Sequence, residues 1–149
     1  MPSRPLFLDT GPLGQVVHPR QNRPIHFWLQ RVLEGGIEVV VPEICDYELR
    51  RNLLLEGLTE SLRRLDVTKS FLSYRRITTP IMVRAAELWA EARRGGRPSA
   101  DKNALDGDVI LAASAEAVDG IVITDNIGHL NLFVEARHWT SFGAPGKPI

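Results

Sequence analysis

Short apolar runs alternate along this chain with longer segments whose apolar positions recur at helical spacing. Three runs, Leu6–Leu8, Ile37–Val41 and Ile121–Ile123, are almost entirely apolar, which is typical of strands buried on both faces. Helices are predicted around and between them, over His26–Leu33, from Pro42 to about Leu55, over Glu60–Leu65, from Pro80 to Gly95–Gly96, over Asp108–Val118, and briefly over Leu130–Val134. The segment Phe71–Ile77 fits either a strand or a helix end, and polar Arg97–Asn103 predicts a loop.

Strands separated by helices favour parallel pairing through right-handed crossovers. We therefore expect an α/β fold, a three-layer α/β/α sandwich with a central, mainly parallel sheet. A length of 149 residues suits one domain, which we expect to cover residues 1–142, with a flexible C-terminal tail over 143–149.

Composition says more about where the protein acts than about which reaction it catalyses. The 18 basic and 18 acidic residues give a formal net charge of zero, so overall charge provides no argument for a polyanionic partner. The single cysteine, Cys45, cannot form an internal disulfide and is interpreted as a small buried residue. No segment predicts a signal peptide or a membrane span, so we expect a cytoplasmic protein with no membrane partner.

Acidic residues follow or face the ends of the predicted strands. Asp9 and Asp125 come directly after the first and last strands, whose carboxyl ends form the usual ligand-binding edge of a parallel sheet. Either one alone would more often be a turn or cap residue. Glu48 lies in the helix after the second strand, and Asp106 and Asp108 are expected at a helix start, with Asp106 as N-cap. Such a carboxylate cluster needs protons or cations to offset its repulsion.

Oxygen-only ligands predict Mg²⁺ or Mn²⁺ in place of zinc. Such an ion activates a water and stabilises the oxygens of a phosphoryl displacement. Thr10 and Thr124 each neighbour a proposed ligand, where a hydroxyl would bond a carboxylate or a water. The histidines lack metal-ligand spacing and are interpreted as surface or packing residues, with His129 held in reserve: His18, His26, His129 and His138.

Four motifs, in this order and spacing, resemble the PIN-domain family over most of the chain. They are LFLDTGPL at 6–13, PEICDYELRRNL at 42–53, LDGDVILAASA at 105–115 and ITDNIGHL at 123–130. The resemblance implies a Mg²⁺- or Mn²⁺-dependent endoribonuclease acting on single-stranded or structured RNA. It carries the catalytic acids to Asp9, Glu48, Asp108 and Asp125, and the metal ligands to Asp9, Asp108, Asp125 and an auxiliary Asp106.

Two features of this resemblance leave alternatives open. Either Asp125 or Asn126 occupies the last metal-facing position, and Gly11-Pro12 replaces the serine that is common after the first acid. Many compact members are toxins of type II toxin–antitoxin pairs, so the resemblance also implies a homodimer held inactive by a small antitoxin protein.

Substrate contacts are expected from Thr10, Thr124, Asn126, Arg97 and Lys102, the last two in the polar loop before the third motif. The arginine pairs at 50–51, 63–64, 75–76 and 93–94 are more simply solvated helix faces. The chief alternative is a non-catalytic PIN-like module that binds RNA or protein. A phosphotransfer domain ranks lower, because Gly11 stands where a second aspartate would be needed.

Overall fold

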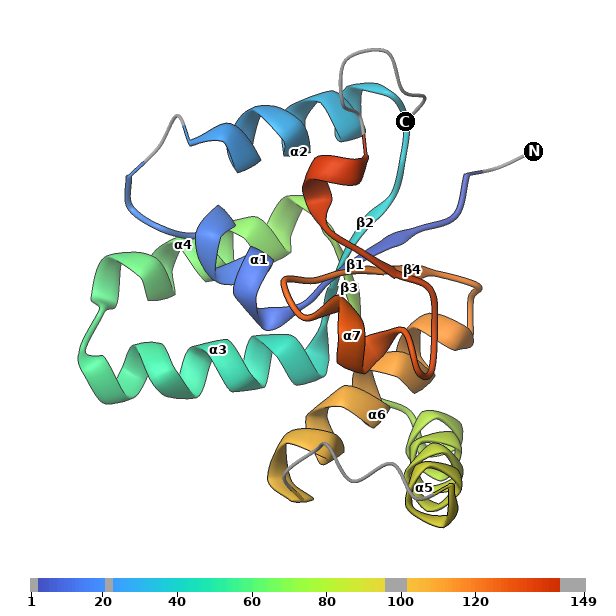
Figure 1. Cartoon of the computed structure of the whole chain (residues 1–149). Coiled ribbons are helices and arrows are strands. Elements are labelled where there is room, and N and C mark those ends of the chain that lie inside the picture. Colours follow the sequence, from blue (N-terminus) through green and yellow to red (C-terminus); the bar gives the residue numbers. More distant parts are fainter. Residues whose placement is uncertain (1–2, 21–22, 96–101, 143–149) are drawn as a thin grey trace.

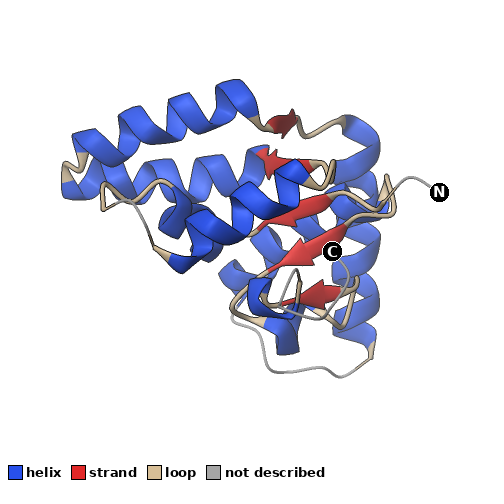
Figure 2. Ribbon diagram, turned by 90° about the horizontal axis from the view of Figure 1, so that it is seen from above, coloured by secondary structure: helices blue, strands red, loops and turns tan. Residues whose placement is uncertain are grey.

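The computed structural model describes residues 3–20, 23–95 and 102–142, with side chains in the last range from Asp106 onward. Its five strands are β1 (Leu6–Leu8), β2 (Val39–Pro42), β3 (Ser73–Arg75), β4 (Ile121–Ile123) and β5 (Ala136–Arg137). They form one sheet in the order β3-β2-β1-β4-β5, in which every neighbouring pair is parallel (Figure 2).

Helices follow or precede nearly every strand, as the chain trace in Figure 1 shows. They are α1 (Thr10–Val16), α2 (Pro24–Glu34), α3 (Glu43–Glu56), α4 (Thr59–Phe71), α5 (Thr79–Arg94), α6 (Lys102–Glu116), α7 (Ile127–Leu130) and the 3₁₀ turn η1 (Trp139–Ser141). The expected α/β/α sandwich with a parallel sheet is confirmed. The proposed tail at 143–149 lies outside the described residues, and the domain limit at 142 stays a prediction.

The core explains why the central strands read as unbroken apolar runs. All residues of β1, β2 and β4 are buried, and the largest fully buried side chains are Phe7 and Trp28. A second cluster joins α5 to α6, which contact each other extensively below the sheet in Figure 1. There Ala85, Ala112 and Ala113 let the two helices approach closely. This second cluster fixes α6, which carries two of the acids.

Helix α6 begins at Lys102, so the expected loop over 97–103 and the helix start at Asp108 were wrong for this part. Polar Lys102 and Asn103 were taken as loop residues, but neither breaks a helix. Residues 96–101, and Arg97 with them, lie outside the described residues. The consequence for the site is that Asp106 and Asp108 stand inside a helix and not at its N-cap.

Other differences concern short or proline-containing elements. A glycine and a proline in succession ordinarily indicate a turn, yet Gly11 and Pro12 lie in the first turn of α1. A proline is tolerated there because the backbone N–H that it lacks has no partner within the helix. Strand β3 occupies part of the ambiguous segment, β5 has only two residues, and α7 precedes the short helix expected at Leu130–Val134. Helix α4 runs to Phe71, well past the predicted Leu65.

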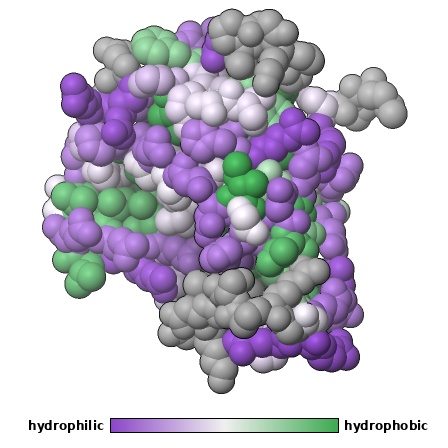
Figure 3. All heavy atoms as spheres, viewed as in Figure 1, coloured by the Kyte–Doolittle hydropathy of each residue, from purple (hydrophilic) through white to green (hydrophobic). Residues whose placement is uncertain are grey.

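The face shown in Figure 3 is mostly polar, but apolar side chains gather at its left, where α3 passes into α4. Leu54, Leu55 and Leu58 are all exposed there, Leu55 by 85% of its surface. Within the described part of the chain, no helix combines the length and the apolar character needed to cross a membrane.

Candidate metal-dependent active site

Asp9 is held at the carboxyl end of β1 by three donors. As the N-cap of α1, its Oδ1 accepts the Thr10 backbone N–H at 2.8 Å. Its Oδ2 accepts the hydroxyl of Thr124 at 2.8 Å, from the end of the adjacent strand β4. The Cys45 thiol of α3 lies 3.8 Å from Oδ1. Asp9 is therefore a helix cap, as the simpler interpretation held, and it is also joined to two other elements of the sheet edge.

Glu48 reaches the same edge from α3. The Thr10 hydroxyl donates to Glu48 Oε1 at 3.1 Å, which orients the carboxylate beside Asp9. On its other side the carboxylate lies against Gly107 of α6, where an added Cβ would stand 2.6 Å from Oε2. Burial raises the pKa of Glu48, and the charge of Asp9 raises it further, while the Thr10 hydrogen bond and Arg51 oppose the shift.

Asp108 completes this group from α6. Burial raises its pKa from 3.8 to about 6, the negative charges of Asp9 and Glu48 add to the shift, and His129 opposes it. Asp9, Glu48 and Asp108 thus lie close enough for their charges to oppose one another. We call these three residues the acidic trio.

Asp106 is turned away from Asp108. Two residues apart within a helix point to nearly opposite sides, so the expected N-cap arrangement that aimed both at one volume was wrong. Asp106 is exposed and faces the space between α6 and its neighbours α3 and α5. Its auxiliary metal role stays a prediction.

Asp125 and Asn126 point in different directions. The exposed Asp125 carboxylate lies 3.5 Å from Gln15 Nε2 and 3.3 Å from His138 Nε2. Asn126 instead contacts His129 across 3.1 Å, and His129 is the residue whose charge acts on Asp108. These contacts link Asn126 to Asp108 through His129, while the Asp125 carboxylate lies against Gly11, two residues after Asp9. Which of the two faces the metal stays open.

Two of the residues predicted to contact substrate, Thr124 and Thr10, make hydrogen bonds to the acids. Thr124 is buried, and its hydroxyl both donates to Asp9 and accepts the Asn126 backbone N–H at 2.9 Å, so the structure gives it a positioning task. The hydroxyl of Thr10 is likewise bonded to a carboxylate. Arg97 and the side chain of Lys102 lie outside what the structure describes, and their contacts with substrate stay predictions.

Cys45 was not included in the site by sequence, although its burial was expected. The thiol is fully buried, and burial together with the Asp9 charge raises its pKa well above the usual value. It serves as a neutral neighbour of Asp9. The only available signal was its position three residues before Glu48, on the same side of α3.

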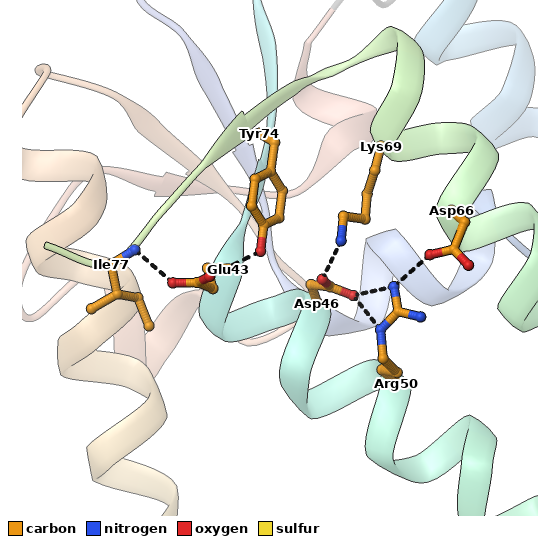
Figure 4. Close-up of polar contacts among 7 residues, drawn as sticks. All are labelled: Glu43, Asp46, Arg50, Asp66, Lys69, Tyr74 and Ile77. Atoms are coloured by element: carbon orange, nitrogen blue, oxygen red, sulfur yellow. Dashed lines mark hydrogen bonds and ion pairs between the residues drawn. The ribbon is translucent and has the colours of Figure 1, made fainter.

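The opposite side of α3 is anchored by the ion pairs drawn in Figure 4. Buried Asp46 accepts hydrogen bonds from Lys69 of α4 at 2.7 Å and from Arg50 Nε at 3.0 Å. Arg50 also donates to Asp66 at 2.8 Å. A carboxylate this buried requires such partners. Because these contacts fix the rotation of α3, they also fix the direction in which Glu48 points.

Glu43 ties the start of α3 to β3 and to the residues after it (Figure 4). It accepts the Tyr74 hydroxyl at 3.2 Å and the Ile77 backbone N–H at 2.9 Å. Burial and the Glu43 charge raise the pKa of Tyr74 to about 12, so the phenol remains a donor. Glu43 is consequently a structural acid, despite lying near the same sheet edge.

The donor chemistry of the acidic trio fits a hard divalent cation. Its ligands are carboxylate oxygens, and burial together with the charge of Asp9 raises the pKa values of Glu48 and Asp108, so a cation would offset this negative charge. Among the described residues, no three acidic, histidine or cysteine side chains form a ready-made metal cage. Mg²⁺ typically binds through one or two carboxylates plus waters and substrate oxygens, and does not need such a cage.

Comparison with known proteins identifies the family of this chain. The family model described as PIN domain matches residues 6–131. A search by sequence finds no matching curated protein. One similar solved structure is VapBC2 from Rickettsia felis bound to a DNA fragment from their promoter, with a TM-score of 0.74, 16% identity, and coverage of 91% of this chain and 98% of that one.

Two further structures support the same fold. A chain of DNA-bound VapBC from Salmonella typhimurium has a TM-score of 0.67 and 20% identity, covering 92% of this chain and 99% of that one. FitAcB from Neisseria gonorrhoeae has a TM-score of 0.68 and 23% identity, with coverage of 92% and 99%. The family model spans most of the sequence, and the chain therefore belongs to the PIN-domain family.

Proposed function

We propose that this protein is a Mg²⁺- or Mn²⁺-dependent endoribonuclease that hydrolyses single-stranded or structured RNA. The observation that carries the proposal is the acidic trio: Asp9 follows β1, Glu48 lies in the helix after β2, and Asp108 lies in the helix before β4. Their charges act on one another, as the raised pKa values of Glu48 and Asp108 indicate. A cluster of partly buried carboxylates is costly to a fold and is characteristic of functional sites.

Within this proposal each residue has a distinct task. Asp9 and Asp108 would hold the metal, with Asp125 or Asn126 completing the set, and the ion would supply an activated water and charge stabilisation at the phosphate. Thr124 keeps Asp9 in place by a hydrogen bond of 2.8 Å. Glu48, which the Thr10 hydroxyl orients, would accept a proton from the attacking water.

The proposal includes partners. The PIN-domain resemblance and the likeness to the VapBC and FitAcB structures support a toxin of a toxin–antitoxin pair, acting in the cytoplasm as a homodimer restrained by a small antitoxin. The exposed leucines at the α3–α4 junction are the kind of apolar surface that a protein partner covers.

The test is cleavage of a fluorophore–quencher RNA by purified protein with Mn²⁺, Mg²⁺ or EDTA. We expect cleavage with either metal, none with EDTA, and loss of at least roughly 100-fold in rate for Asp9→Asn and Asp108→Asn. Asp106→Asn should have a smaller effect. The matched control is Asp119→Asn, because Asp119 is 83% exposed at its side chain and has a positive φ that asparagine tolerates. Metal-independent cleavage would contradict the proposal.

A non-catalytic PIN-like binding module is the second candidate. It is favoured by one observation, the lack of a ready-made metal cage among the described residues. Calorimetric titration with Mn²⁺ separates the two functions. A nuclease site requires saturable Mn²⁺ binding that Asp108→Asn removes, whereas a binding module would bind RNA equally well with and without the ion.

A further inference from the structure

A cavity of about 420 Å³ opens beside the acidic trio, between α3 and α6. Its lining includes the apolar side chains of Ile44 and Ile110, the α3 residues Tyr47 and Arg51, and the acidic residues Glu48 and Asp106. Its volume lies within the usual range for small-ligand pockets. Because Glu48 belongs to both the cavity and the trio, a group bound here would lie next to the proposed site of cleavage.

Tyr47 and Arg51, which line this cavity from α3, form a paired aromatic and cationic surface. The Arg51 guanidinium carbon lies 5.1 Å from the centre of the Tyr47 ring, within cation–π distance. The two residues are one helical turn apart on α3, and the Tyr47 side chain is 58% exposed. An aromatic ring that lies beside a cation and is more than half exposed to solvent offers a stacking surface.

Arg51 also supplies positive charge where a polyanion must approach carboxylates. It is the only basic residue among the described residues that line the cavity, and it shares that lining with Glu48. Guanidinium groups bind phosphate well, and unstacked bases of single-stranded RNA bind on aromatic and arginine planes. The apolar residues and the stacking surface suit a nucleobase, and the cation suits the phosphate attached to it. Together these groups match one nucleotide.

We propose that this cavity, called the base pocket below, binds one unpaired nucleobase of a single-stranded RNA substrate, with the base stacked on the Tyr47–Arg51 pair and Arg51 contacting its phosphate. This inference rests on the proposed nuclease function and specifies its substrate as RNA with at least one splayed-out base beside the cleaved bond. Duplex RNA, whose bases are stacked on one another, does not fill the base pocket.

The test measures binding and cleavage separately. Binding of a fluorescent 12-nucleotide single-stranded RNA is followed by anisotropy, with Ca²⁺ present to balance the acidic charge. Stacking on an aromatic residue contributes enough that Tyr47→Ala should raise Kd by roughly 5- to 100-fold. Tyr47→Phe should stay within about twofold because it keeps the ring, while Tyr47→Leu should resemble alanine. Phe27→Ala on α2 is the matched control, since Phe27 is similarly exposed at 55%.

A second arm identifies the base itself. Single abasic substitutions are moved along the RNA, and one position should weaken wild-type binding as much as Tyr47→Ala does. At that position the abasic RNA should bind wild type and Tyr47→Ala equally, because each change removes the same contact. An unchanged Kd for Tyr47→Ala, or equal effects of Tyr47→Ala and Phe27→Ala, overturns the base pocket. Failure of wild type to cleave RNA with Mn²⁺ overturns the nuclease function instead.

Discussion

Replacing Asp108 with asparagine should stabilise the metal-free protein. Burial, with the nearby charges of Asp9 and Glu48, raises the pKa of Asp108 to about 6, so at neutral pH the native state holds a carboxylate in surroundings that disfavour it. Asparagine has nearly the same shape and no charge. The substitution therefore removes the repulsion while leaving the packing of α6 in place.

The size of the effect follows from the pKa. A shift from 3.8 to about 6 corresponds to roughly 3 kcal/mol above pH 7, at about 1.4 kcal/mol for each pH unit. The side chain is partly open to water, which reduces this to about 1–2 kcal/mol. For a chain of this size, that is an increase of about 3–6 °C in Tm.

The same shift sets a pH dependence with a definite sign. The carboxylate destabilises the native state fully above pH 6, and this cost is lost as pH falls from about 6 towards 3.8, because Asp108 takes up its proton first in the native protein and only near 3.8 in the unfolded chain. Wild type should therefore approach the stability of Asp108→Asn at acidic pH. Saturating Mn²⁺ should stabilise wild type selectively, because binding to the native state adds to its stability.

The assay is urea denaturation in EDTA at pH 7.5 and pH 4.5, followed by tryptophan fluorescence. Asp119→Asn serves as the exposed-carboxylate control and should change stability by less than about 0.5 kcal/mol. Two results would refute this expectation. One is a lower stability of Asp108→Asn than of wild type at pH 7.5, and the other is a difference in unfolding free energy between the two proteins that is as large at pH 4.5 as at pH 7.5. Either outcome would make Asp108 a structural residue.

Three further substitutions or reactions test neighbouring parts of the site. Gly107→Ala should reduce RNA cleavage at least roughly tenfold without lowering Tm, because its Cβ displaces the Glu48 carboxylate while alanine favours the helix; unchanged cleavage would contradict this. Asp46→Ala should lower the free energy of unfolding by about 2–3 kcal/mol in urea melts, since Lys69 loses its buried partner; a loss below about 0.5 kcal/mol would show that the pair contributes little. Cys45 should not react with Ellman's reagent at pH 8 until urea unfolds the protein, and rapid labelling of the native state would refute its burial.

The central strands and the acids beside them were predictable because burial on both faces leaves a clear sequence pattern. Leu6–Leu8 and Ile121–Ile123 are the observed strands β1 and β4, and Asp9 follows the first of them as expected. Helix α6 was misjudged at its start, because its first residues, Lys102 and Asn103, are polar and follow a segment rich in turn-forming residues. Strand β5, with two residues, is too short to have a pattern.

The proximity of Asp9, Glu48 and Asp108 was predictable from the sequence, but their hydrogen bonds were not, and their roles stay predictions. The acids follow from strand ends and from the PIN-domain resemblance, whereas the bond from Thr124 to Asp9 joins residues 115 positions apart. The opposite facing of Asp106 and Asp108 depended on where α6 begins. Tyr47 and Arg51 appeared only as ordinary helix residues, because their pairing over a cavity requires α6 to lie across from α3.

The most direct test of the proposed metal site is a crystal structure of the wild-type protein soaked in Mn²⁺, with data collected at the manganese absorption edge. We expect an anomalous peak bound by Asp9 and Asp108, with Glu48 facing the same volume, and no such peak in crystals of Asp108→Asn. A peak held by other residues, or none at Mn²⁺ concentrations that support RNA cleavage, would contradict it.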